Sequence, residues 1–322
     1  MMAHIETTGT NGDKPNQEIF AETLQQLAAD DRDIIAVTSD SRGSGKLVPF
    51  GKKFPAQIVE VGIAEQNLVG VAAGLASAGK KVFAVSPACF LTARALEQIK
   101  NDIAYSDNPV TVVGISAGVS YGALGSTHHS LHDFAVLRAI NNITVVVPAD
   151  NFEAAQATSL AAKTNSPVYL RFGKKVMKPL KEVNDDAFSF GKGRVITEGN
   201  DAAIIACGET VYPALQAAQL LAEQNIHATV ISMHTIKPLD TVLLARLAAT
   251  CRAVLTVEEH SVNGGLGEAC AAYLMQYGLH KPFRILGIPD EYTVTGSQQD
   301  IFNHYHLTKE GIADAVKHLL KK

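Results

Sequence analysis

The sequence predicts an α/β protein with two domains, each a mainly parallel sheet flanked by helices. Short, continuously apolar strand segments alternate with helix segments along most of the chain, which is typical of parallel sheets that are covered on both faces. The alternation is interrupted once, at residues 172–190, where the sequence loses its periodicity and becomes charged. A linker at 172–190 is therefore expected to join the two domains.

The first domain is predicted at residues 17–171 and follows a polar leader, 1–16, that we expect to be disordered. Its strands are expected at 34–38, 58–61, 82–85, 110–115, 143–147 and 168–171. Its helices are expected at 18–29, 65–75, 92–105, 131–139 and 151–163.

The second domain is predicted at residues 191–322, as a smaller and independent unit. Its strands are expected at 202–207, 228–232, 253–257 and 283–288. Its helices are expected at 211–224, 241–250, 266–277 and 309–320.

Composition excludes several classes of function. A net charge of −4 with interspersed signs gives no basic stripe, so no nucleic acid is expected as a partner. No apolar run reaches membrane-spanning length and the leader has no apolar signal core, so no membrane is expected either. The four cysteines form neither a CxxC nor a metal pattern, which indicates reduced thiols in a cytoplasmic protein.

A helix-start glutamate is the first candidate for chemistry. Glu65 follows the strand at 58–61 and Gly62, and it opens a largely apolar helix, where the helix dipole favours a carboxylate. No Lys or Arg stands within ten residues on either side in sequence. If it is buried, the acid must be protonated or hydrogen-bonded to something that this stretch does not supply. An ordinary surface acid is the simpler interpretation of this stretch by itself.

Glycine-rich loops mark two further places. The loop after the strand at 110–115 carries several glycines and ends in Thr127, His128 and His129; loops of this kind bind ligands at the carboxyl edge of a parallel sheet. Adjacent histidines point in different directions, so they make a poor joint metal site, and both could lie on the surface.

In the second domain, the glycines of 263–267 could bind an anion, although tight chain turning is the favoured explanation. The neighbouring segment Glu258-Glu259-His260 is interpreted as a hydrogen-bonded structural corner rather than an acid/base cluster. No P-loop, GxGxxG or GxSxG motif is present in the chain.

Several stretches, taken in order, resemble the transketolase family, in its pyrimidine-binding and C-terminal domains. In the first domain these are VGIAEQNLVGVAAGLA, FLTARALEQIKNDIAY, GSTHHSLHDFAVLRAI, ITVVVPADNFEAA and VYLRFG. In the second they are IACGETVYPAL, IKPLD, VEEHSVNGGLGEA, GIPDEY and LTKEGI. The resemblance extends from about residue 17 to the end of the chain.

The resemblance also implies a partner chain. Whole-length transketolases begin with a domain that carries GDG and a later Asn, which together hold magnesium and thiamine diphosphate. Here the only GD pair, Gly12-Asp13, lies in the polar leader without a strand before it. The chain thus resembles the C-terminal subunit of a split transketolase that needs an N-terminal subunit, in an α2β2 heterotetramer. That partner would hold the diphosphate and Mg²⁺, so no metal site is expected in this chain.

The same resemblance assigns roles at the cofactor. Glu65 matches the glutamate that hydrogen-bonds N1′ of the aminopyrimidine and so promotes loss of the thiazolium C2 proton. A carboxyl without a competing cation suits this role. Phe90 matches an aromatic residue that stacks near the pyrimidine, and Asp40 matches an acid near the cofactor.

Roles at the sugar follow in the same way. His128 matches a histidine that bonds the donor hydroxyls or the carbonyl oxygen as charge develops. Ser44 and Arg171 match groups that hold the sugar phosphate. The reaction implied is transfer of a two-carbon ketol unit from a ketose phosphate to an aldose.

Departures from the family pattern concern the substrate. The loop usually reads GEDGxTH and here reads GALGSTH, so Ala123 and Leu124 replace two acids. A histidine earlier in the loop is Ser116, and an arginine near the domain start is Gln17. Because leucine cannot bond a sugar hydroxyl beside the cleaved bond, we expect a non-standard donor or acceptor, such as a branched, deoxy or otherwise modified sugar.

Three alternatives stay open at this point. The chain could be the β subunit of a 2-oxo acid dehydrogenase, which shares the domains and the helix-start glutamate. It could also be part of an enzyme that synthesises a deoxyketose phosphate from pyruvate, although enzymes of that class are normally one long chain and keep the loop acid. It could also be a non-catalytic subunit, an idea that Leu124 and Ser116 leave open and that Glu65, Phe90 and His128 oppose.

Overall fold

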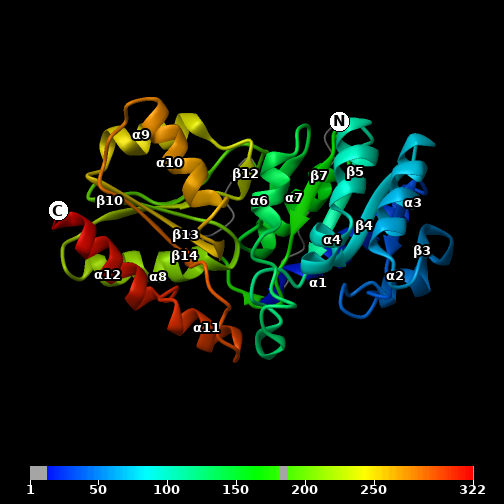
Figure 1. Cartoon of the computed structure of the whole chain (residues 1–322), viewed down its shortest axis with the longest axis horizontal. Helices are drawn as coiled ribbons and strands as arrows, with labels where there is room; N and C mark the ends of the chain where they lie inside the picture. The colour runs from blue at the N-terminus through cyan, green and yellow to red at the C-terminus, as the bar shows by residue number, and fades with distance from the viewer. Residues whose placement is uncertain (1–12, 181–187, 322) are drawn as a thin grey trace.

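The computed structural model describes residues 13–180 and 188–321 and shows two helix-covered sheets side by side (Figure 1). The predicted strands and most predicted helices are present. Residues 1–12 of the predicted leader and 181–187 of the predicted linker lie outside the described part of the chain.

A seven-stranded sheet in the order β12-β6-β7-β5-β4-β2-β3 forms the centre of the first domain. Strands β2 to β7 pair in parallel, so their carboxyl ends, and the loops that follow them, meet at one edge. Their bounds are Ile34–Thr38 (β2), Ile58–Glu60 (β3), Lys81–Pro87 (β4), Val110–Ile115 (β5), Thr144–Val146 (β6) and Val168–Arg171 (β7).

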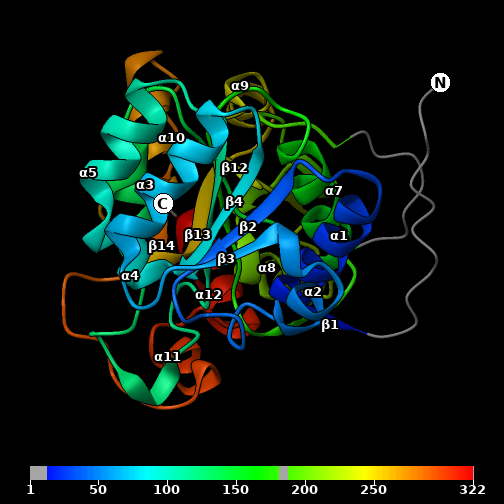
Figure 2. The ribbon, with the colours of Figure 1, turned by 90° about the vertical axis from the view of Figure 1, so that its right-hand side faces the viewer.

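Helices cover both faces of this sheet (Figure 2). On one face, α1 (Asn16–Asp30) and α7 (Asn151–Ala161) bury residues such as Phe20 and Leu24 against the strands. The other face carries α3 (Glu65–Ser77), α4 (Ala88–Arg94), α5 (Leu96–Gln98) and α6 (Asp133–Ala139). The single helix predicted at 92–105 is in fact α4, α5 and a π-helical segment, Ile99–Tyr105, with a break at Ala95.

The second domain is built on a five-stranded sheet in the order β14-β13-β10-β11-β9. Its strands are β9 (Arg194–Thr197), β10 (Ala202–Ala206), β11 (Ala228–Ser232), β13 (Ala253–Ser261) and β14 (Phe283–Ile288). Its helices are α8 (Val211–Ala222), α9 (Thr241–Thr250), α10 (Leu266–Gln276), α11 (Gln298–His304) and α12 (Lys309–Leu320). The sequence did not predict β9, α11 or the short α2 (Val48–Lys53) of the first domain.

The second domain is not an independent unit, contrary to the prediction. Directly after β11, the chain crosses to the first sheet, where β12 (Thr235–Lys237) pairs antiparallel with β6. One continuous apolar cluster joins Leu68 and Phe134 of the first domain to Leu247 and Leu266 of the second. The two domains therefore share a strand pairing and one apolar core.

The segments before and after the first domain are also ordered in part. Lys14–Pro15 (β1) pairs antiparallel with Val176–Met177 (β8), so residues 14–16 of the predicted leader and part of the predicted linker are structured. Leu180 is buried as well. Two-residue strands carry no strong apolar pattern, and the sequence therefore did not reveal them.

Candidate active site

Glu65 is the first residue of α3 and lies at the carboxyl edge of the seven-stranded sheet. Gly62, with φ of +73°, makes the turn between β3 and this helix, a conformation that favours glycine. Although Glu65 opens the helix, it is only 5% exposed. An open cavity of about 630 Å³ lies beside it, lined by residues 63–67 and Arg94. The acid is thus buried at the wall of a cavity and is not an ordinary surface residue.

The expectation that Glu65 lacks a cation is wrong. The Nη1 atom of Arg94 donates a hydrogen bond to Glu65 Oε1 at 2.9 Å, and the arginine side chain is 51% exposed. Arg94 ends α4, and α3 and α4 follow the strands β3 and β4, which flank β2. The two residues are distant in sequence, but the sheet brings their helices together.

Next to Arg94 lies a group of ring side chains that extends the site. The guanidinium carbon of Arg94 lies 4.4 Å from the ring centroid of Phe90. The His128 ring meets Phe90 edge-on at 5.3 Å and Tyr121 at 5.5 Å. Glu65, Phe90 and His128, which the sequence singled out separately, therefore form one connected group with Arg94.

Asp40 and Ser44 lie on the loop after β2, next to the edge at which α3 begins. Asp40 adopts φ of +54°, and its amide donates to Glu60 Oε1 at 2.6 Å. Both side chains are exposed. They are accessible to a ligand at this edge, but the structure does not bring them into contact with the Glu65 group.

The buried position of Arg171 does not fit the phosphate-binding role predicted for it. Arg171 is 4% exposed; its Nε donates to Asp133 Oδ2 at 2.8 Å, and its Nη2 donates to the carbonyls of Ser130 and Glu259. Burial would raise the pKa of Asp133, but the guanidinium and His260 lower that pKa overall. Arg171 thus joins the two domains structurally.

Another cation is available near His128. Lys174 is exposed, and its Nζ lies 4.9 Å from the ring centroid of Tyr121, the ring that meets His128. A lysine near an aromatic ring in the segment after β7 carries no sequence signal of its own, and the sequence analysis missed it.

The glycine-rich loop between β5 and α6 is fixed by the second domain. Glu259 Oε1 accepts from the amide of Val119 at 3.0 Å. His129 is buried, and burial lowers its pKa. The neutral ring donates from Nε2 to Gly122 O at 3.0 Å and accepts through Nδ1 from the Thr293 hydroxyl at 2.6 Å. Of the two adjacent histidines, His129 therefore holds the loop and His128 faces the site.

The tip of this loop carries the departures from the family pattern. Leu124 is 54% exposed, and Ala123 is exposed beside it. Gly122 has φ of +51°, and a Cβ atom there would stand 2.6 Å from Gly296 O, so the loop packs closely against the second domain. Ser116 and Gln17, in contrast to the tip, are buried.

The segment Glu258-Glu259-His260 is a buried structural cluster in β13, as predicted. Glu258 accepts from the amides of Leu266 at 2.7 Å and Gly267 at 2.8 Å. The start of α10 is thus already capped by a carboxylate of the chain, which does not fit an anion site at 263–267.

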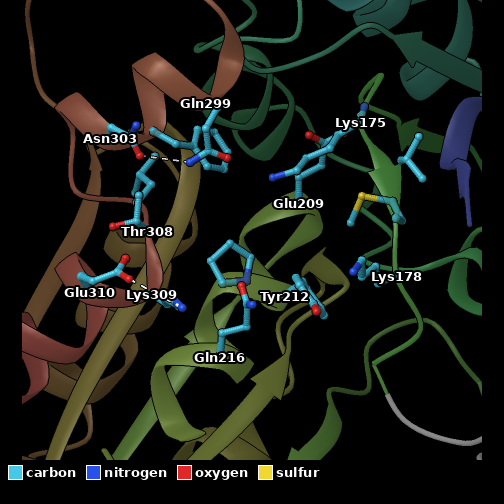
Figure 3. Close-up of a pocket in the computed structure, with 15 residues that line it drawn as sticks. Lys175, Lys178, Glu209, Tyr212, Gln216, Gln299, Asn303, Thr308, Lys309 and Glu310 are labelled. Carbon is cyan, nitrogen blue, oxygen red and sulfur yellow. Dashed lines mark hydrogen bonds and ion pairs between the residues drawn. The ribbon is translucent and has the colours of Figure 1, made fainter. Parts of the chain in front are cut away.

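A second cavity, of about 320 Å³, lies between β8 and the second-domain helices α8, α11 and α12 (Figure 3). Lysines stand on both of its walls, with Glu209 and Tyr212 between them. Glu209 is linked through Gln298 to Glu259, at 2.5 and 2.8 Å. All predicted site residues are described by the structure, and none of them lines this cavity.

Two family patterns cover the chain. The transketolase pyrimidine-binding domain matches residues 14–179, and the transketolase C-terminal domain matches residues 191–312. The chain belongs to the transketolase family. This finding confirms both the resemblance and the predicted fold class. Transketolase-family enzymes depend on thiamine diphosphate.

Individual relatives of this transketolase-family chain are matched over nearly their whole length. It is 48% identical over 303 residues to one of the subunits of apulose-4-phosphate transketolase from Phocaeicola vulgatus, covering 94% of this chain and 96% of the relative. It is 36% identical to "Putative transketolase C-terminal section" of Methanocaldococcus jannaschii, covering 94% and 95%. A solved structure, "Split gene transketolase, inactive beta4 tetramer", superposes with a TM-score of 0.86 at 35% identity, covering 96% and 99%.

Within the described residues, no helix is long and apolar enough to cross a membrane.

Proposed function

We propose that the chain is one subunit of a two-chain, thiamine diphosphate-dependent transketolase, and that Glu65 is its acid at the cofactor. The observation that carries this proposal is a carboxylate buried at the wall of an open cavity, 5% exposed, within a group that contains Phe90 and His128. Burying a carboxylate is costly unless it is paired. Glu65 is paired with a half-exposed arginine, and the open cavity beside the acid allows a ligand to reach it.

The residues present fit the aminopyrimidine end of the cofactor. Phe90 offers an aromatic face, and Glu65 offers a carboxylate oxygen that would hold a proton at N1′. When bound, thiamine diphosphate supplies the carbon that carries the two-carbon unit between sugars. Asp40 is assigned to the same end of the cofactor because it lies exposed on the loop after β2.

The diphosphate end and Mg²⁺ are assigned to an N-terminal partner subunit. One relative is named as a subunit of a transketolase and another as a C-terminal section, and both names support a second chain. Ile63, at the wall of the Glu65 cavity, is 74% exposed, and a partner chain would cover this apolar side chain. We propose an α2β2 heterotetramer in the cytoplasm, a compartment that suits the four free cysteines.

The donor we propose is apulose 4-phosphate, because the relative that is 48% identical carries this substrate in its name. The loss of a loop acid at Leu124 is a second reason to propose a donor other than the standard pentose phosphates. His128 is assigned to the donor oxygens, since it faces the site from beside Phe90. Ser44 and the exposed Lys174 are assigned to the sugar phosphate in place of the buried Arg171.

Replacement of Glu65 tests this function. In the complex reconstituted with the N-terminal subunit, Glu65→Gln should lower kcat for ketol transfer from apulose 4-phosphate about 100-fold or more, because the amide cannot share a proton with N1′. The exposed Glu223→Gln is the matched control and should keep full activity. Full turnover by Glu65→Gln would contradict the proposal.

A binding measurement tests the division between subunits. Thiamine diphosphate with Mg²⁺ should bind the complex, whereas the isolated chain should bind it at least about tenfold more weakly by calorimetry, because the diphosphate contacts are missing. Equally tight binding to the isolated chain would contradict the assignment of the diphosphate to the partner.

A further inference from the structure

Arg94 makes two contacts at the site, and both are with residues proposed to hold the cofactor. It donates to Glu65 Oε1 at 2.9 Å, and its guanidinium lies 4.4 Å from the Phe90 ring centroid. We infer that Arg94 occupies the place of the aminopyrimidine ring before the cofactor binds and that binding displaces it. This inference rests on the proposed function and adds a residue to it.

Arg94 resembles the aminopyrimidine in shape and in its hydrogen-bond partner. A guanidinium is flat, stacks on aromatic faces and donates N–H groups to carboxylates. The aminopyrimidine is also flat and needs the same face of Phe90 and the same carboxylate of Glu65. Arg94 spans the ring and the acid, so the face that it covers is the one directed toward Glu65. Two flat groups cannot occupy that space together.

The local structure allows the side chain to leave. Arg94 is the last residue of α4, and Ala95 interrupts the helix with φ of −104° and ψ of 20°. The side chain is 51% exposed and borders an open cavity of about 630 Å³. Because the arginine already reaches solvent, its guanidinium can move into water while a ligand takes over its contacts with the buried acid.

The displacement also has a chemical consequence. While Arg94 donates to Glu65, a cation competes for the oxygen lone pairs that would accept the proton shared with N1′. Once Arg94 has moved, the carboxylate is free to interact with the ring nitrogen. Arg94 is thus a positioning residue that satisfies a buried acid until the cofactor arrives.

Cofactor affinity tests the inference directly. Calorimetric titration of the reconstituted complex with thiamine diphosphate and Mg²⁺ should give a Kd about three- to tenfold lower for Arg94→Met than for the wild type, because the competitor is gone. Loss of a positive charge near an anionic ligand would by itself weaken binding, so tighter binding is specific to displacement. Arg94→Lys, which keeps the charge without the flat fork, should fall between the two.

The matched control is Arg252→Met, which removes a partly exposed arginine that is paired with Asp201 at 3.2 Å in the second domain. It should leave the Kd unchanged. If Arg94→Met does not fold, as judged by its melting curve, Arg94→Gln replaces it. An unchanged or higher Kd for the folded Arg94 variant would overturn the placeholder role alone, whereas a wild-type complex that binds no thiamine diphosphate would overturn the proposed function as well.

Discussion

The residues of the site differ in how clearly the sequence around each one indicates its role. Glu65, Phe90 and His128 each stand in a motif of the family, and the structure connects them through ring contacts and Arg94. Arg94 itself stands in the stretch FLTARALEQ, but no sequence spacing links it to Glu65. The link arises because α3 and α4 begin at the same sheet edge, and the strand order therefore could have revealed it.

A substitution at Leu124 is expected to change the preference for the donor sugar more directly than one at any other residue. Leu124→Asp restores an acceptor for the sugar hydroxyl beside the cleaved bond, and the position is 54% exposed, so it should tolerate the change. The ratio of kcat/KM for xylulose 5-phosphate to that for apulose 4-phosphate should rise about 10- to 100-fold.

Leu124→Ala separates the gain of an acceptor from the loss of leucine. It should change the kcat/KM ratio by less than about threefold, because it adds no hydrogen-bonding group. An equal shift in both variants would mean that side-chain size at this position, and not hydrogen bonding, selects the donor.

At the scale of elements, the loop between β5 and α6 depends on a segment of the other domain. Thr293 bonds both His129, at 2.6 Å, and Ser126, at 3.0 Å, while Glu259 holds Val119. The second domain, which contributes none of the predicted site residues, thereby sets the position of His128 and Leu124. The glycines reveal the loop in the sequence, but its anchoring residues cannot be identified there, because they lie 140 or more residues away.

Thr293→Val is expected to loosen this loop. It leaves the buried His129 Nδ1 without its hydroxyl donor, which costs about 1–3 kcal/mol. We expect KM for the sugar donor to rise about 5- to 20-fold, with the Kd for thiamine diphosphate changed by less than about twofold, since Glu65 and Phe90 are on other elements.

The control for this prediction is Thr293→Ser, which keeps the hydroxyl and should have a KM close to that of the wild type. Steady-state kinetics and cofactor titration of the same preparations provide the readout. A parallel loss of cofactor affinity would show that the anchor supports the whole site and not the sugar side alone.

At the scale of the molecule, the two domains are joined by buried ionisable groups as well as by β12. Arg194 of β9 donates to Asp150 at 2.9 Å and lies near Glu153, at 3.4 Å, both in the first domain. Burial raises the pKa of Glu153 to about 8, and burial next to Glu209 raises that of Glu259 to about 8. Burial also lowers the pKa of His260 to about 4.

These shifts predict a stability that falls as pH rises from about 4.5 to about 8. Glu153 and Glu259 keep protons in the folded state that the unfolded chain loses near pH 4.5, so their stabilising contribution is full below 4.5 and is lost as pH rises through about 8. The contribution of His260 is lost only on the acid side, as pH falls from 6.5 through about 4. The melting temperature should therefore decrease from pH 6.5 to 8.5.

Glu259→Gln tests the assignment, because it removes one of the buried carboxyls with a raised pKa and should flatten the decrease by up to about 1.4 kcal/mol per pH unit. The exposed Glu198→Gln should keep the wild-type slope. Thermal melts at several pH values measure both, and an unchanged slope in Glu259→Gln would show that this carboxyl is ionised in the folded protein across the range.

The sequence by itself determined the two α/β domains, the parallel strands and the family, because apolar periodicity and short motifs are local properties. The tertiary structure alone decided which side chains meet: Arg94 with Glu65, Arg171 with Asp133 and Thr293 with His129. It also decided that β12 crosses between the sheets. The physical reason is that strand order and helix packing bring distant residues together, and no spacing along the chain encodes those contacts.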